Sequence, residues 1–205
     1  LELARAVAEA VWSVHWVDGR LRRTSLAGVA GDASAMAEDY GALALGFARL
    51  AGAIGDPVWL ARAVQLLEVA MAHFGAEDGG FYDAADDAEP LFARARDVSD
   101  NPTPSGTMCL VAALRLTGLL SDRADFIARA DQAALTVRGL AVASPRFAGA
   151  ALVDLLVADE ARTGLGPAVA AVVTDDPLSD LARATWRMAP IGTAVLVGRS
   201  GTAGF

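Results

Sequence analysis

The sequence predicts a mainly α-helical fold, consisting of about half of an (α/α)6 barrel of helical hairpins and a small C-terminal β-α-β segment. Apolar residues recur at helical spacing along most of the 205 residues, a helix-turn-helix unit occurs twice, and two short β-branched runs flank a helix near the end. We therefore expect the partial barrel over residues 1–163 and the β-α-β segment over residues 164–205.

The periodicity predicts six barrel-type helices. Before the third, Asp56 and Pro57 combine an N-cap residue with a proline at the first helical position, which favours a helix start. From residue 75 to 103 the periodicity fails, and Gly, Asp and Pro predict a long structured loop in which residues 80–82 and 91–93 can pair as a small hairpin. The helices are expected over residues 1–16, 38–54, 57–74, 105–120, 122–138 and 144–160.

An internal repeat supports the hairpin arrangement. The segment from Arg49 to Asp56 recurs 66 residues later as Arg115 to Asp122, and each copy ends in a tight Gly-Asp or Ser-Asp turn. Helical hairpins bury their apolar faces only against neighbours, and a closed ring of six hairpins has twelve helices. We expect the other half of the ring to come from a missing N-terminal half of the same protein or from a complementary chain. An open α-solenoid is the alternative, although its repeats usually span roughly 34 to 47 residues.

The last part of the chain has a different pattern. Short β-branched runs over residues 168–174 and 193–197 flank a helical stretch over residues 178–188. A parallel strand pair with one crossover helix is the expected arrangement.

Composition narrows the class of protein. Apolar residues make up 54% of the chain, a surplus that predicts an interface, yet no apolar run reaches the roughly 18 to 20 residues of a membrane span. The net charge is -8, which argues against a nucleic-acid surface. The single cysteine, Cys109, lies in an apolar helical stretch and predicts a buried thiol in a reducing, cytoplasmic setting. The chain begins within a helix and without Met, so we expect it to be part of a larger protein.

Several motifs occur in the order typical of a known family. They are Glu38-Asp39-Tyr40, the turn from Gly55 to Leu60, Gly79-Gly80-Phe81-Tyr82 and Pro104-Ser105-Gly106. With them the chain resembles the C-terminal region of the thioredoxin-domain-containing proteins related to spermatogenesis-associated protein 20.

The resemblance implies an N-terminal thioredoxin-like domain outside this chain and an (α/α)6 barrel of the six-hairpin glycosidase type, similar to the N-acylglucosamine 2-epimerases. Two features depart from the family. Thr107-Met108 stands where the family usually has Asn-Ser, and the usual Cys-containing tail after the last strand is absent.

In barrels of this type, the helix that starts near Glu38 and the loop from Asp78 to Ser105 are expected to face one cavity. Glu38 and Asp39 are the candidate general acid and base for sugar chemistry. Their side chains point about 100° apart on a helix, so both cannot face one bond squarely. The alternative is that they are first-turn carboxylates that stabilise the helix dipole.

Aromatic and polar residues complete the candidate site. Tyr40, Phe81 and Tyr82 can form a stacking platform for a sugar ring, or can simply pack in the core. Arginine and a helix start after proline can bind a carboxylate or phosphate, whereas the alternative is a salt-bridged loop with a serine helix cap. The polar candidates are Arg94, Arg96, Asp100 and Ser105.

No motif predicts a metal or another cofactor. His15 and His73 have no metal-ligand spacing around them, and no phosphate-binding loop or dinucleotide fingerprint occurs. We expect the chain to form a wall of the sugar-binding cavity of a carbohydrate-active or epimerase-like protein, with a small saccharide as ligand and no activity of its own. The sequence leaves isomerase and glycosidase chemistry open. The alternative is a non-catalytic interaction module that accompanies the thioredoxin-like domain.

Overall fold

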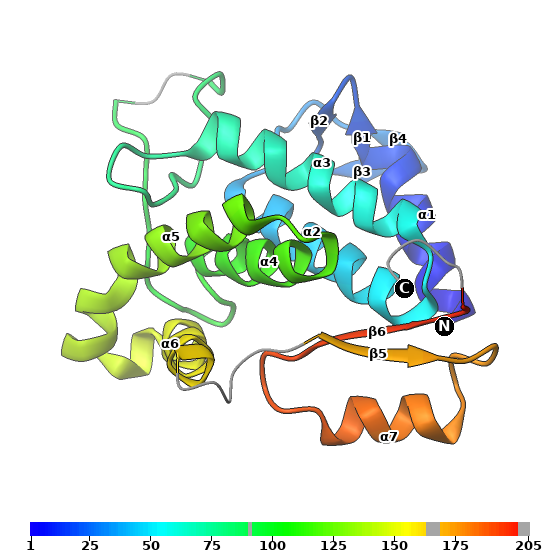
Figure 1. The fold of residues 1–205 in the computed structure, drawn as a ribbon. Helices are drawn as coiled ribbons and strands as arrows, with labels where there is room; N and C mark the ends of the chain where they lie inside the picture. The colour runs from blue at the N-terminus through cyan, green and yellow to red at the C-terminus, as the bar shows by residue number, and fades with distance from the viewer. Residues whose placement is uncertain (90–91, 163–168, 201–205) are drawn as a thin grey trace.

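The computed structural model describes residues 1–89, 92–162 and 169–200, and helices dominate these ranges (Figure 1). The predicted mainly α-helical class is therefore confirmed. None of the described helices is long and apolar enough to cross a lipid bilayer. The helices are α1 (Glu2–His15), α2 (Ala37–Ile54), α3 (Pro57–Phe74), α4 (Gly106–Ser121), α5 (Ala124–Ala143), α6 (Gly149–Arg162) and α7 (Asp180–Met188).

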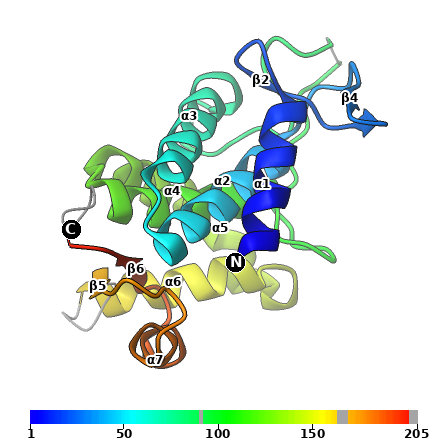
Figure 2. The same ribbon diagram turned by 90° about the vertical axis from the view of Figure 1, so that its right-hand side faces the viewer.

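Four helices form two hairpins at the centre of the molecule. Helix α2 lies along α4, while α3 packs on α2 and α5 packs on α4 (Figures 1 and 2). Phe47, Trp59 and Phe126 are among the large side chains buried between them. Gly41 allows the close approach of α2 to α4, because a Cβ there would lie 2.6 Å from the backbone nitrogen of Leu110. A shared core therefore joins the two hairpins.

The turns of the two hairpins differ by one residue. In the first, Gly55 ends α2 in the left-handed conformation, and the Asp56 carboxylate accepts a hydrogen bond of 3.1 Å from the Val58 backbone nitrogen. In the second, Asp122 itself takes the left-handed conformation, with φ of 54°. Helix α5 begins only at Ala124, so the expected helix start at residue 122 is wrong by two residues.

The sixth helix is shorter than expected because a 3-10 turn, η1 (Pro145–Phe147), precedes it. Helix α6 begins at Gly149 and packs against α5 and α4. A buried ion pair fastens it to α4, since Arg115 donates to both carboxylate oxygens of Asp154 at 2.5 and 2.9 Å. Helix α6 thus extends the packing of the second hairpin, α4–α5.

Four short strands occupy the region between α1 and α2, nearly all of which lies outside the helices predicted from the sequence. They are β1 (Trp16–Val17), β2 (Arg20–Leu21), β3 (Ser25–Leu26) and β4 (Val29–Ala30), paired as two antiparallel hairpins. The backbone nitrogen of Leu21 donates a hydrogen bond of 2.9 Å to the hydroxyl of Tyr40. This buried contact anchors the strands to α2.

The long loop after α3 is fastened to the start of α2. Phe81 is fully buried and pairs with Gly75 in an isolated bridge, while Leu91 of the expected hairpin partner lies outside the described residues. The backbone nitrogen of Ala37 donates to the carbonyl of Asp83 at 3.0 Å, and that of Asp83 donates to the carbonyl of Ala95 at 2.9 Å. The two arms of the loop are therefore held beside the first turn of α2.

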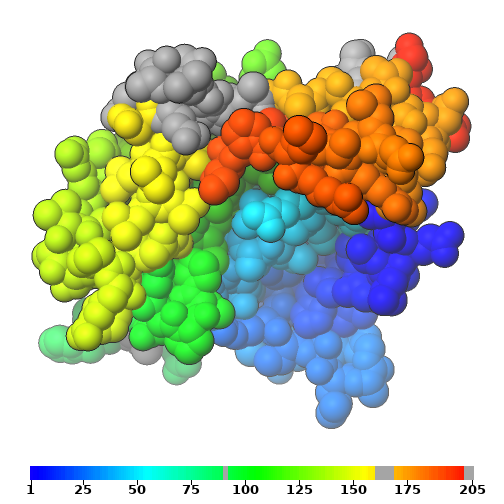
Figure 3. All heavy atoms as spheres, turned by 90° about the horizontal axis from the view of Figure 1, so that it is seen from below, coloured from blue at the N-terminus to red at the C-terminus, as the bar shows by residue number. Residues whose placement is uncertain are grey.

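The predicted β-α-β unit is present near the C-terminus. Strands β5 (Val169–Val173) and β6 (Ala194–Gly198) pair in parallel, with α7 as the crossover helix. Strand β6 packs across α2, and Figure 3 shows this unit beside α6 on one face of the molecule. Val195 and Val197 are buried with residues of β5 and α7 in a small second core.

Candidate functional site

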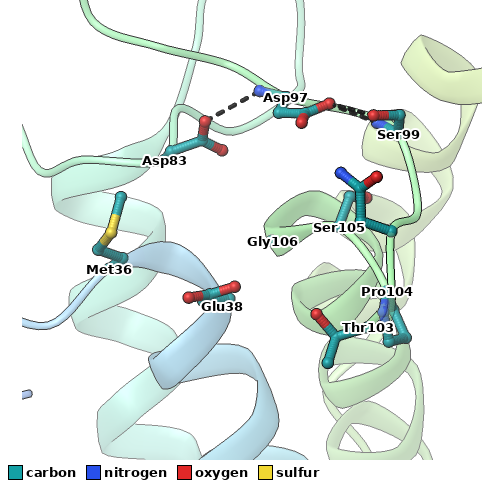
Figure 4. Close-up of a pocket in the computed structure, with 10 residues that line it drawn as sticks. Met36, Glu38, Asp83, Asp97, Ser99, Thr103, Pro104, Ser105 and Gly106 are labelled. Atoms are coloured by element: carbon teal, nitrogen blue, oxygen red, sulfur yellow. Dashed lines mark hydrogen bonds between the residues drawn. The ribbon is translucent and has the colours of Figure 1, made fainter.

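A polar cavity of about 230 Å³ lies where α2 and α4 begin (Figure 4). One side is formed by the first turn of α2, another by the start of α4, and the long loop after α3 closes it. Three carboxylates and several hydroxyl or amide groups line the cavity. The lining residues are Met36, Glu38, Asp83, Asp97, Ser99, Asn101, Thr103, Pro104, Ser105 and Gly106.

Glu38 projects into this cavity from the first turn of α2 (Figure 4). Its carboxylate accepts a hydrogen bond of 2.5 Å from the guanidinium of Arg23, and both side chains are partly exposed. The helix N-terminus and Arg23 both favour negative charge at this position. Glu38 is therefore a carboxyl group of the cavity wall that Arg23 holds in place.

Asp83 faces the same cavity from the long loop (Figure 4). Burial raises the pKa of its carboxyl group, and the neighbouring charges of Asp97 and Glu38 raise it further. The hydrogen bond from the backbone nitrogen of Asp97, at 2.9 Å, opposes this rise without reversing it. The net effect of these surroundings is a raised pKa for the Asp83 carboxyl group.

Asp97 has the opposite environment. The hydroxyl and the backbone nitrogen of Ser99 donate to one of its carboxylate oxygens at 2.5 and 2.9 Å, and these bonds lower its pKa. One cavity thus holds two carboxyl groups whose pKa values are shifted in opposite directions. Such a pair can divide the roles of proton donor and proton acceptor.

Asp39 and Tyr40 do not line the cavity. The carboxylate of Asp39 accepts a hydrogen bond of 2.8 Å from the backbone nitrogen of Met36, which caps the start of α2. The Tyr40 ring is 1% exposed and its hydroxyl accepts from Leu21. The structure places both residues in the helix start and the core, the alternatives that the sequence had left open for them.

Phe81, Tyr82 and Arg94 form contacts within the loop and with the helices α3 and α5. The Arg129 guanidinium lies 4.1 Å from the centre of the buried Phe81 ring, and that of Arg94 lies 4.1 Å from the centre of the Tyr82 ring. Arg94 also donates to the carbonyls of residues 73 and 84 at 2.9 and 2.6 Å. These three side chains hold the loop together beside the cavity rather than lining it.

Arg96, Asp100 and Ser105 are also engaged within the chain. Arg96 forms an ion pair of 2.6 Å with Asp78. Asp100 accepts hydrogen bonds from the backbone nitrogens of Ser105 and Ala150, at 3.0 and 2.8 Å, and so links α4 to α6. The Ser105 hydroxyl caps α4 and remains on the cavity wall. Of the nine residues that the sequence suggested, Glu38 and Ser105 reach the cavity.

Sequence reasoning missed Asp83 and Asp97. Neither lies in a periodic segment, and their separation of 14 residues matches no motif. They meet because two arms of the loop pair through backbone hydrogen bonds. Asp83 directly follows Gly79-Gly80-Phe81-Tyr82, and this adjacency to a buried aromatic is the one signal in the sequence that points to it.

A second cluster of polar side chains lies at the end of α3. Ligand atoms of His73, Asp86 and Asp87 lie within 4.8 Å of one another, a set that can hold a divalent cation. The guanidinium of Arg20 donates to both carboxylate oxygens of Asp87, and His73 contacts Asp86 at 2.8 Å. Because Arg20 already supplies a positive charge to Asp87, the cluster is a salt-bridged corner of the loop.

No protein-family model matches the chain, and no curated protein matches it either. The family resemblance of the motifs therefore stays a prediction.

Proposed function

We propose that the polar cavity is part of the active site of a carbohydrate-active enzyme, of the epimerase-like or glycosidase-like kind, that acts on a small saccharide. The observation that carries this proposal is the placement of Asp83, Asp97 and Glu38 around one cavity, with the pKa of Asp83 raised and that of Asp97 lowered. Sugar chemistry is performed mainly by carboxyl groups that divide acid and base roles in this way.

In the proposed reaction, Asp83 is the general acid. In this role it transfers a proton to a leaving oxygen or to a carbon centre of the sugar, and the raised pKa of its carboxyl group supports the assignment. Asp97 and Glu38 are the candidate bases, which accept a proton from water or from the substrate on the opposite side. The hydroxyl and amide groups of Ser99, Asn101 and Thr103 line the same space and match the hydroxyls of a sugar ring.

The size of the cavity supports a small ligand. Its volume of about 230 Å³ lies just below the roughly 300 to 1,000 Å³ of pockets for drug-sized molecules. A monosaccharide suits this space better than an extended oligosaccharide. Specificity would then come from the polar groups of the loop rather than from a long binding groove.

We further propose that the helices are one half of an (α/α)6 barrel related to the spermatogenesis-associated protein 20 family, with the other hairpins supplied by a missing N-terminal half or a complementary chain. The succession of α2–α3, α4–α5 and α6, each packed on the next, supports this proposal. So does the position of the cavity at the start of α2 and α4, where barrels of this type carry their sites.

A specific observation favours a second candidate function, that of a non-catalytic interaction module. Asp39, Arg94, Arg96 and Asp100 all use their charged groups for contacts within the chain. Side chains engaged in this way stabilise the loop, so fewer charged groups remain to bind a substrate.

A binding and turnover experiment separates the two candidates. Saturation-transfer NMR with a panel of monosaccharides is applied to the chain, and turnover is measured on the protein that contains the complete barrel. Asp83→Asn and Glu38→Gln are expected to abolish turnover, because each removes a proton-transfer group while keeping the shape of the side chain. Asp125→Asn, which removes only an exposed carboxylate beside Arg123, is the control. Absence of saccharide binding, or full turnover in both variants, supports the interaction module instead.

A further inference from the structure

A second, larger cavity of about 600 Å³ lies between α2, α4, α6 and the β-α-β unit. Figure 3 looks onto this face and shows a hollow bordered by the β-α-β unit, α6, α4 and α2. Its walls are mostly apolar. The one ion pair among the described residues that line it joins Arg115 to Asp154 through two hydrogen bonds. The volume falls within the range of small-molecule pockets. Apolar lining residues include Leu45, Met108, Leu116, Leu119, Val153 and Ile191.

A neighbouring cavity of about 420 Å³ carries positive charge. It shares Arg49 and Trp186 with the larger cavity, so the two spaces meet at these side chains. Arg183 and Arg187 of α7 line it as well, and no carboxylate is among its lining residues. None of the three arginines forms an ion pair with the residues that the structure describes. On a chain of net charge -8, this is a local concentration of uncompensated positive charge.

Two acidic residues of the segment before α7, Asp175 and Asp176, are engaged with other groups. Asp175 pairs with Arg199 at 3.2 Å, and the Asp176 carboxylate accepts a hydrogen bond of 2.8 Å from the backbone nitrogen of Leu178. Neither of these carboxylates pairs with Arg49, Arg183 or Arg187 in the part of the chain that the structure describes. Guanidinium groups bind carboxylates and phosphates through paired hydrogen bonds.

We propose that these two adjoining cavities bind an amphipathic anion, with its carboxylate or phosphate head at Arg49, Arg183 and Arg187 and its alkyl body in the larger cavity. Trp186 lies at the junction, where a side chain with an apolar ring and a polar N–H suits the change from head to body. The proposal is independent of the sugar chemistry proposed above, because neither Glu38 nor Asp83 lines either space.

Isothermal titration calorimetry on the full chain tests this proposal with four probes: decanoate, decyl phosphate, decanol and acetate. We expect one equivalent of decanoate or decyl phosphate to bind, and the comparison of these two identifies the preferred head group. Decanol lacks the charge and acetate lacks the body, so both are expected to bind at least about tenfold more weakly. Equal affinity for decanol and decanoate would overturn the charged head site, and absence of binding by both anions would overturn the proposal altogether.

Three variants locate the ligand. The double variant Arg183→Gln, Arg187→Gln is expected to weaken binding of the anion about tenfold, whereas Arg138→Gln, an exposed arginine of α5 outside both cavities, leaves it unchanged. Ala112→Phe reduces the apolar cavity and should weaken decanoate binding without affecting the head site. The arginines are exposed, so circular dichroism should show that their variants fold normally. Unchanged affinity in both the double variant and Ala112→Phe contradicts the proposed location.

Discussion

The backbone nitrogen of Asp97 donates a hydrogen bond of 2.9 Å to the carboxylate of Asp83, which lies 14 residues earlier in the chain. This contact joins the two arms of the loop at the cavity and brings two carboxyl groups close together. Burial is nevertheless the main reason that the Asp83 pKa is raised, and the Asp97 charge adds to it. The same contact thus helps to build the cavity, while as a hydrogen bond to the carboxylate it opposes the rise that burial causes in the Asp83 pKa.

Asp83→Asn is expected to stabilise the fold at neutral pH. Because the pKa of Asp83 is raised in the folded chain, its carboxyl group contributes most to stability below its ordinary pKa, and this contribution is lost as the pH rises through the raised value. Asparagine keeps the acceptor for the Asp97 backbone nitrogen and removes the charge. Since Asp83 is partly exposed, we expect a gain of roughly 1 to 3 °C in melting temperature at pH 7.

Melting curves at pH 7 and pH 3 check this prediction. At pH 3 the wild-type carboxyl group is protonated and the difference between the two proteins should disappear. Asp97→Asn is the matched control, because Ser99 lowers the pKa of that residue, and it should destabilise the chain at pH 7. A lower melting temperature for Asp83→Asn than for the wild type at pH 7 would contradict the predicted stabilisation.

Asp154→Asn is expected to be strongly destabilising. Arg115 donates two hydrogen bonds to this buried carboxylate, and the neutral side chain would leave a largely buried guanidinium without its main counter-ion. Loss of one partner of a buried pair costs about 3 kcal/mol. Asp131→Asn removes the second, exposed partner of Arg115 and should cost less than about 1 kcal/mol. Urea unfolding of both variants checks the contrast, and similar losses would contradict the distinction between buried and exposed partners.

Tyr40→Phe tests whether the Tyr40 hydroxyl stabilises the core. Removing the hydroxyl leaves the buried backbone nitrogen of Leu21 without its acceptor, which we expect to cost about 1 to 2 kcal/mol of unfolding free energy. The matched variant Tyr82→Phe alters a partly exposed hydroxyl, whose residue contacts Arg94 through the ring, and should be nearly neutral. Saccharide binding should be unchanged by Tyr40→Phe. Loss of saccharide binding in this variant would indicate that Tyr40 contacts the ligand.

Periodicity in the sequence was enough to predict the helices and the β-α-β unit, because both depend on local apolar spacing. The unit is observed with α7 between β5 and β6 as expected. The geometry of the two hairpin turns was harder to predict from the sequence. Asp56 caps α3 through its side chain, whereas Asp122 adopts a left-handed conformation, and the similarity of the two repeats conceals this difference.

The sequence predicted where the candidate site lies better than it predicted which residues line it. The start of α2, which the helical pattern placed near Glu38, is observed at Ala37. Asp83 and Asp97 could not be predicted, because backbone pairing within an irregular loop brings them together and such pairing has no periodic signal. Charged residues such as Arg94 show the reverse error, since the sequence does not reveal that backbone carbonyls already occupy their donors.

The packing of α2 on α4 leads to a final prediction, on two glycines of the same helix. In Gly41→Ala the new Cβ would lie 2.6 Å from the backbone of α4 at Leu110, so the two helices must move apart, and we expect a loss of about 2 kcal/mol or more. A Cβ at Gly46 meets no atom within 4 Å, so Gly46→Ala should stabilise the chain by about 0.5 to 1 kcal/mol through helix propensity alone. Urea unfolding of both variants measures the change in unfolding free energy, which should be a loss for Gly41→Ala and a gain for Gly46→Ala. If Gly41→Ala were as stable as the wild type, the close contact between α2 and α4, and with it the position of Glu38 relative to Ser105, would be incorrect.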